Sequence, residues 1–218
     1  FDFGYQVLPR SRADILSDEV NLPALLVNEI HADPADPGGD ANGDGVRSAT
    51  DDEFVELANP AESPLDVSGW TISDAIGVRH TFPAGTTIPA GEVTVVFGGG
   101  TPTGSFGAAA ADGLVFTAST GGLGLNNTGD TVTVMDALGA VVQQVTYGGE
   151  GGNDQSLVRN PDLTNSPFAL HTVADTVDGS RFSLAGDLAV ASDHIYGLTL
   201  LRVARPDAMP PQVIPYDL

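Results

Sequence analysis

A short acidic loop carries oxygen-bearing side chains at the spacing of a calcium site. Asp40, Asn42 and Asp44 stand at positions 1, 3 and 5 of the loop, and Gly45 stands at position 6, where such a loop turns sharply. Val46, at position 7, would offer its main-chain carbonyl. Carboxylates this crowded repel each other by about 1 kcal/mol per pair at 4 Å in water, and by about 4 kcal/mol at an effective dielectric of 20. The pattern therefore predicts a bound hard cation, and Ca²⁺ is the simplest choice.

The end of the loop leaves the last ligand open. Its twelfth position, which usually holds a bidentate Glu, is Asp51, and Asp52 and Glu53 follow directly. Any of these three carboxylates could serve as the last ligand. Residues 53–57 alternate with a period of two, so we expect the loop to join strands rather than the helices of an EF-hand. The alternative is a solvated turn, because Asp, Asn and Gly also favour turns without a metal.

Two more carboxylates lie in alternating segments on either side of this loop. Glu29 precedes the loop and Glu56 follows it. Both could extend the metal shell if their side chains turn toward the loop. As an alternative, each is an ordinary exposed carboxylate on a strand.

The composition excludes several partners. The chain has 218 residues, with 29 acidic and 8 basic residues, a formal charge of -21, and no Lys. Without a basic patch there is no electrostatic source for binding nucleic acid or an anionic membrane surface. No apolar run approaches the 18 residues of a membrane span, so we expect no membrane insertion.

The absence of Cys has a second consequence. Disulfides, thiolate metal sites and thiol nucleophiles are all impossible in this chain. A secreted protein without disulfides can use bound calcium to hold its fold, and the weak affinities of extracellular modules, with Kd of about 10⁻⁴ to 10⁻³ M, suit external calcium. We therefore expect a secreted protein, extracellular or at the cell surface. Adaptation to a salty habitat is a compatible explanation for the acidity.

Short β-rich runs separated by Gly, Pro and Asn recur along most of the chain, at intervals typical of a sandwich. No run of comparable length has helical periodicity, so we predict an all-β fold. The expected strands are 24–30, 54–58, 65–73, 78–82, 93–98, 114–117, 131–136 and 141–147. Trp70 is expected on a central strand as the core plug, with Phe54, Leu57, Ile72, Phe82 and Val95 around it.

Several of these segments resemble the motifs of a lamin tail domain, in order and with plausible spacing. They are Val-Asn-Glu-Ile at 27–30, Asp-Glu-Phe-Val-Glu-Leu-Ala-Asn-Pro at 52–60, Leu-Asp-Val-Ser-Gly-Trp at 65–70, Phe-Pro-Ala-Gly at 82–85 and Leu-Asn-Asn-Thr-Gly-Asp-Thr-Val at 125–132. The resemblance covers residues 23 to about 147, with an echo at 154–159. It implies an immunoglobulin-like β-sandwich of the bacterial branch, in which similar Asp-rich inserts look like calcium binders. The Ser-Pro-Gly segment that often closes the family is Ser-Leu-Ala-Gly at 183–186 here.

We therefore expect three regions, which are an N-terminal extension at 1–22, a lamin-tail-like sandwich at 23–186 and a C-terminal strand with a Pro-rich extension at 187–218. Residues 1–8 alternate apolar and polar side chains, and residues 195–203 do something similar. Either segment could add a strand to the open sheet edge of a neighbouring copy. Both could also pack back on their own domain.

Residues for catalysis are scarce. The four His residues are scattered, and the Gly-rich segments lack the pattern of a nucleophile elbow or a dinucleotide site. The sequence thus predicts a protein that is not an enzyme. We expect a structural subunit of an extracellular filament or surface layer, forming a homo-oligomer or homopolymer by terminal strand exchange. The alternative is an adhesive or substrate-binding module appended to a secreted enzyme.

Overall fold

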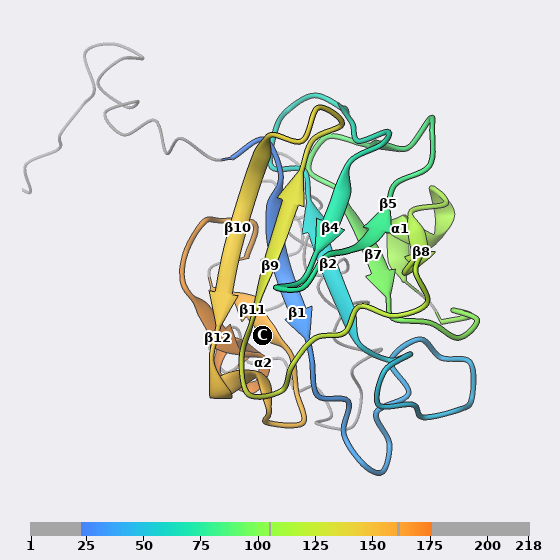
Figure 1. The fold of residues 1–218 in the computed structure, drawn as a ribbon, viewed down its shortest axis with the longest axis vertical. Helices are drawn as coiled ribbons and strands as arrows, with labels where there is room; N and C mark the ends of the chain where they lie inside the picture. Colours follow the sequence, from blue (N-terminus) through green and yellow to red (C-terminus); the bar gives the residue numbers. More distant parts are fainter. Residues whose placement is uncertain (1–22, 105, 161, 176–218) are drawn as a thin grey trace, which may run out of the picture.

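A computed structural model describes residues 23–104, 106–160 and 162–175. Two sheets face each other across an apolar core, so the expected all-β sandwich is confirmed (Figure 1). The expected donor segments 1–8 and 195–203 and the expected domain boundary at 186 lie outside the described residues.

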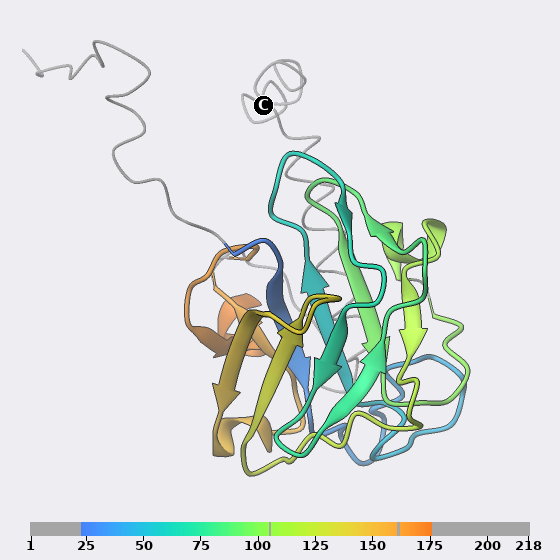
Figure 2. The same cartoon turned by 45° about the horizontal axis from the view of Figure 1, so that its top comes forward.

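The larger sheet has six strands in the order β12, β11, β1, β2, β7, β8. All neighbours are antiparallel except β7 and β8, which are parallel. The bounds are β1 Leu26–His31, β2 Phe54–Ala58, β7 Val93–Phe97, β8 Val115–Thr117, β11 Leu157–Arg159 and β12 Phe168–Leu170. The 22 residues between β1 and β2 hold the acidic loop, which leaves the sheet at one end of the sandwich (Figure 2).

The smaller sheet has four antiparallel strands in the order β10, β9, β4, β5. Its strands are β4 Thr71–Ser73, β5 Val78–Thr81, β9 Asp130–Met135 and β10 Val141–Tyr147, and a two-stranded ribbon of β3 Leu65–Asp66 and β6 Thr87–Ile88 lies apart. Short helices complete the fold at α1 Gly107–Ala111, η2 Gly149–Gly151 and α2 His171–Asp175. Within the described residues, none of the helices is long and apolar enough to cross a membrane.

The core between the sheets is aliphatic, and Phe82 is its largest fully buried side chain. Phe82 meets the rings of His80 and Phe116 edge-on or nearly so, at centroid distances of 4.7 and 5.6 Å. The prediction that Trp70 plugs the core on a central strand is wrong. Trp70 lies in a turn before β4, where its N–H donates to the carbonyl of Val67, and it only borders the core. This turn splits the expected strand 65–73 into β3 and β4, which belong to different sheets.

A second, smaller apolar cluster is built from the opposite face of the six-stranded sheet. It joins Phe54, Val95 and Phe97 of the sheet to Ala41 of the acidic loop and to Phe106. Phe54 and Val95 were expected beside the main core, and the period of two in their strands places them on this second face instead. The central strands are buried on both faces as a result, and all residues of β1, β2 and β7 are buried.

Candidate metal centre

The acidic loop is folded by the same side chains that the calcium spacing singles out. Asp40 Oδ2 accepts the N–H of Gly45 at 2.9 Å, and Asn42 Oδ1 accepts the N–H of Asp44 at 3.0 Å. Asp44 Oδ1 accepts the N–H of Val46 at 2.9 Å. Gly45 has a φ of 88°, in the left-handed region that glycine adopts without strain. Positions 1, 3 and 5 therefore each use one oxygen to wrap the loop around itself.

The second oxygen of Asp40 is in a different situation. Asp40 Oδ1 is shielded from solvent, and within the described residues it has no hydrogen-bond partner. A buried carboxylate oxygen without a partner costs free energy, since it has lost its water and gained nothing in return. A cation coordinated at this oxygen would remove that cost, so the loop fits the expected ion at this position.

Asp52 closes the loop at its base. Its Oδ1 accepts the N–H of Asn42 at 3.0 Å, and its Oδ2 accepts the N–H of Ser48 at 2.6 Å. Burial raises the pKa of Asp52; the two main-chain donors oppose this effect, and the charges of Asp40 and Asp44 add to it. Both oxygens are thus already engaged in main-chain bonds, which suits a residue that holds the loop in shape.

Three glycines after β7 allow the loop to lie directly on the end of the sheet. A Cβ on Gly98 would overlap the carbonyl of Thr50, one on Gly99 would overlap Asp51, and one on Gly100 would overlap Asn42 and Asp44. Hydrogen bonds from the main chain after β7 join it to the loop instead: Gly98 N–H donates to the main-chain carbonyl of Glu53 at 2.8 Å, and Thr101 N–H donates to the side-chain Oδ2 of Asp44 at 3.1 Å. Sequence reasoning missed this support, although the run of three glycines after a strand was its visible signal.

The side chain of Glu53 points away from the acidic loop and contacts the segment that precedes β9, on the other side of the sheet. Its Oε2 accepts the N–H of Leu125 at 3.2 Å, and the side chain is only 3% exposed. Burial raises the pKa of Glu53 to about 7, although the N–H groups of Leu125 and Gly124 and the charge of Arg79 lower it. Among the three carboxylates considered for the twelfth position, Glu53 is therefore committed to the segment that precedes β9.

Glu29 and Glu56 are both fully buried, so the alternative of exposed strand carboxylates is wrong for both. They face each other across β1 and β2, and Glu56 Oε1 accepts a hydrogen bond from Asn28 Nδ2 at 2.7 Å. His171 Nδ1 lies 4.0 Å from Glu29 Oε1. These contacts attach the two carboxylates to the middle of the six-stranded sheet.

The loop does not gather enough carboxylates to hold an ion by them alone. Across residues 23–104, 106–160 and 162–175, no three His, Asp or Glu side chains lie close enough together to form a metal site. The amide oxygen of Asn42 and the carbonyl of Val46, at positions 3 and 7, would have to complete the coordination of Asp40 and Asp44. This mixture of carboxylate, amide and carbonyl oxygens is the chemistry that Ca²⁺ prefers.

A family model described as Lamin Tail Domain matches residues 21–149, which include the acidic loop, both sheets as far as β10 and the residues packed between them. No curated protein matches the chain.

Proposed function

Because this chain belongs to the lamin tail domain family, a non-catalytic immunoglobulin-like fold, we propose that it is a calcium-stabilised structural protein and not an enzyme. In this proposal it is secreted and assembles with copies of itself into an extracellular filament or surface layer. The observation that carries the calcium part is the buried, unpartnered Oδ1 of Asp40, in a loop already wrapped by Asp40, Asn42 and Asp44.

Because of where the loop lies, calcium bound in it would stabilise the whole domain. The loop connects β1 to β2, and Ala41 and Asn42 at its centre are fully buried. Asn42 Nδ2 donates to the carbonyl of Gly99 at 3.2 Å, and Thr103 N–H donates to the carbonyl of Asn42 at 3.0 Å. An ion that holds the loop would thus also hold the end of β7, and it would hold Ala41 in the second apolar cluster.

The strength of this effect follows from mass action. At a free calcium concentration about ten times Kd, one site adds about 1.4 kcal/mol to the free energy of unfolding. For a domain of this size that corresponds to roughly 3 to 6 °C in Tm. The weak affinity of loops of this kind matches the millimolar calcium outside cells, which is the reason for proposing an extracellular role.

The test is calcium titration of the full chain after treatment with a chelator, followed by calorimetry and by thermal melting. We expect heat of binding, a Tm that rises with calcium, and loss of most of both effects in Asp40→Asn and Asp44→Asn. Asp112→Asn is the matched control, since Asp112 is exposed in the turn after α1, outside the acidic loop, and loses the same charge. Unchanged melting with and without calcium, together with no heat of binding, would rule out the metal site.

Assembly is tested separately by light scattering of the native chain in calcium and in chelator. Large particles that loosen or dissolve on chelation support a calcium-dependent structural assembly. A monomer in both conditions contradicts the proposed assembly and leaves the metal site to be judged by its own titration.

A further inference from the structure

The four-stranded sheet has one edge that is unusually open to pairing. Its edge strand β10 has seven residues, Val141–Tyr147, and none of them is charged or proline. Natural sheets usually protect an edge by making it short or by placing charge or proline on it. An uncharged seven-residue edge is therefore notable in a chain with a formal charge of -21.

The other sheet edges among the described residues are protected. Strand β5 at the far side of the same sheet has four residues and carries Arg79, which pairs with Asp74. Strands β8 and β12 at the two edges of the larger sheet have three residues each. Within the part of the chain that the structure describes, no main-chain hydrogen bond joins β10 to anything except β9 and the turn that connects them.

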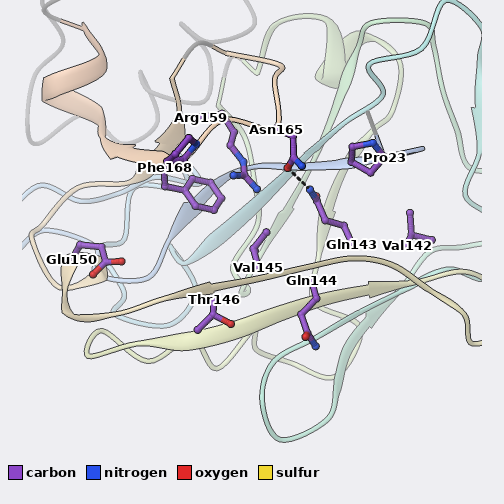
Figure 3. Close-up of a pocket in the computed structure, with 11 residues that line it drawn as sticks. Pro23, Val142, Gln143, Gln144, Val145, Thr146, Glu150, Arg159, Asn165 and Phe168 are labelled. Carbon is purple, nitrogen blue, oxygen red and sulfur yellow. Dashed lines mark hydrogen bonds between the residues drawn. The ribbon is translucent and has the colours of Figure 1, made fainter. Parts of the chain in front are cut away.

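A groove of about 770 Å³ runs along this free edge. Five consecutive residues of β10, 142–146, form one side of it, and the connection from β11 to β12 forms the other (Figure 3). Gln143 reaches across the floor, where its Nε2 donates to Asn165 Oδ1 at 3.2 Å. The groove therefore follows the direction of a strand rather than enclosing a compact ligand.

The far wall is tied to the larger sheet and carries apolar side chains. Arg159 is buried, with its Cζ 4.0 Å from the ring centroid of Phe168, and its Nε donates to the carbonyl of Val27 at 3.1 Å. Its Nη1 donates to the carbonyl of Ser166, which holds the β11–β12 connection in place beside β10. Phe168, with Pro167 and Pro23, gives the groove apolar contacts for side chains that enter it.

This geometry suits one extended segment rather than a second sandwich. In an edge-to-edge pair, each sandwich would bring its own β11–β12 connection against the other, because that connection stands beside β10 (Figure 1). A single strand could lie along the groove without this obstruction. It would pair with the free main-chain groups of β10 and place alternate side chains against the far wall.

We propose that the occupant is residues 1–8 of a second copy, added as a strand to β10. This rests on the proposed function, and it names the surface by which copies join. The segment reads Phe-Asp-Phe-Gly-Tyr-Gln-Val-Leu, with apolar side chains at 1, 3, 5 and 7. That alternation gives a strand one apolar face over seven residues, the length of β10, or about 23 Å. In the other candidate, 195–203, the alternation breaks inside the segment at Leu200 and Leu201, whereas the one adjacent apolar pair of residues 1–8, Val7 and Leu8, stands at its end.

The chain is long enough to reach a neighbour. Residues 9–22 separate the segment from Pro23, which itself lines the groove. Fourteen residues span up to about 46 Å when extended, whereas a sandwich of about 150 residues is about 40 Å across. A copy could therefore donate its first residues to the next copy while its own groove accepts a strand from another, which produces an open chain of subunits.

The first experiment places one charge on each edge of the same sheet. Thr146→Lys on β10 and Thr81→Lys on β5 are matched, since both residues are exposed Thr on edge strands. We expect Thr146→Lys to weaken binding of a synthetic peptide with the sequence of residues 1–8 by about tenfold or more, and to reduce the particle mass in light scattering. Thr81→Lys should leave both unchanged. Large wild-type particles that are insensitive to Thr146→Lys overturn this inference and leave assembly standing, whereas a monomeric wild type overturns assembly itself.

A second experiment identifies the donor, and it uses the absence of Cys from the native chain. Full-length Gly4→Cys is mixed with full-length Thr146→Cys and treated with a short bis-maleimide linker. A covalent pair that contains one chain of each variant supports strand donation between copies, and Thr81→Cys in place of Thr146→Cys should give none. If the two cysteines join only when both are placed in one chain, the segment occupies its own groove and the inference is wrong.

Discussion

Replacing Glu53 with Gln should alter how the stability of this domain depends on pH. Glu53 is 3% exposed, and its Oε2 accepts the N–H of Leu125 at 3.2 Å. Burial raises its pKa from 4.5 to about 7, with the nearby charge of Asp130 adding to the rise and Arg79 opposing it. Gln has the shape of a protonated Glu and can keep the bond to Leu125, so the substitution removes the charge with little change in packing.

The sign and the size of this pH effect follow from the linkage between proton binding and folding. Because the folded-state pKa lies above the unfolded one, the folded domain holds this proton more tightly, and that advantage is lost as pH rises from about 4.5 to about 7. At 1.36 kcal/mol per pKa unit, the ionised Glu53 costs the folded state about 3 kcal/mol. We therefore expect Glu53→Gln to match wild type near pH 4 and to be more stable by up to about 3 kcal/mol near pH 8.

The assay is urea unfolding of wild type and Glu53→Gln at a series of pH values in chelator, so that no cation acts on the acidic loop. The measured quantity is the difference in free energy of unfolding between the two proteins, which cancels the titration of groups that they share. Glu62→Gln is the control, since Glu62 is exposed and its substitution should change stability by less than about 0.5 kcal/mol. A difference between wild type and Glu53→Gln that does not grow between pH 4 and pH 8 would refute the reasoning.

Two further substitutions test the main core and the contact between the acidic loop and the end of the larger sheet. Phe82→Ala removes the largest fully buried side chain of the main core and should lower the free energy of unfolding by about 3 to 5 kcal/mol, whereas Leu138→Ala, 94% exposed in a hairpin turn, should change it by less than about 0.5 kcal/mol. Chemical denaturation measures both, and a loss below about 1 kcal/mol for Phe82→Ala would contradict the core assignment. Gly98→Ala should cost about 1 to 3 kcal/mol and weaken calcium binding, because its Cβ would overlap the carbonyl of Thr50. Gly77→Ala, with open space around it, is the control, and equal melting temperatures and calcium affinities of the two variants would contradict the close approach of loop and sheet.

The sequence predicted the strands well where alternation was local and unbroken. The expected strands 54–58 and 141–147 coincide with β2 and β10, and the expected strand 93–98 differs from β7 by one residue. The prediction for 65–73 was wrong because a turn at Val67–Trp70 sends its two halves to different sheets. The short strands β6, β11 and β12 were missed, since two or three residues are too few to show a period.

The candidate metal site likewise has features that the sequence predicted and features that it could not predict. The spacing of Asp40, Asn42 and Asp44 depends only on local chain geometry, and each of these side chains bonds to a main-chain N–H within five residues. The direction of Glu53 and the burial of Glu29 and Glu56 were not readable from the sequence. Those properties depend on contacts with residues distant in the chain, such as the contact of Glu53 with Leu125.

The sequence by itself determined the all-β character of the chain, its family and the calcium-like spacing of oxygen-bearing side chains in the loop, because periodicity, motif order and loop spacing are all local properties. Only the tertiary structure decided that β10 is an edge strand beside a groove, and that the larger sheet is covered on both faces. Edges and faces arise when strands far apart in the chain pair and pack. The apolar alternation of a strand can be read from its own residues, but its neighbours in the sheet cannot.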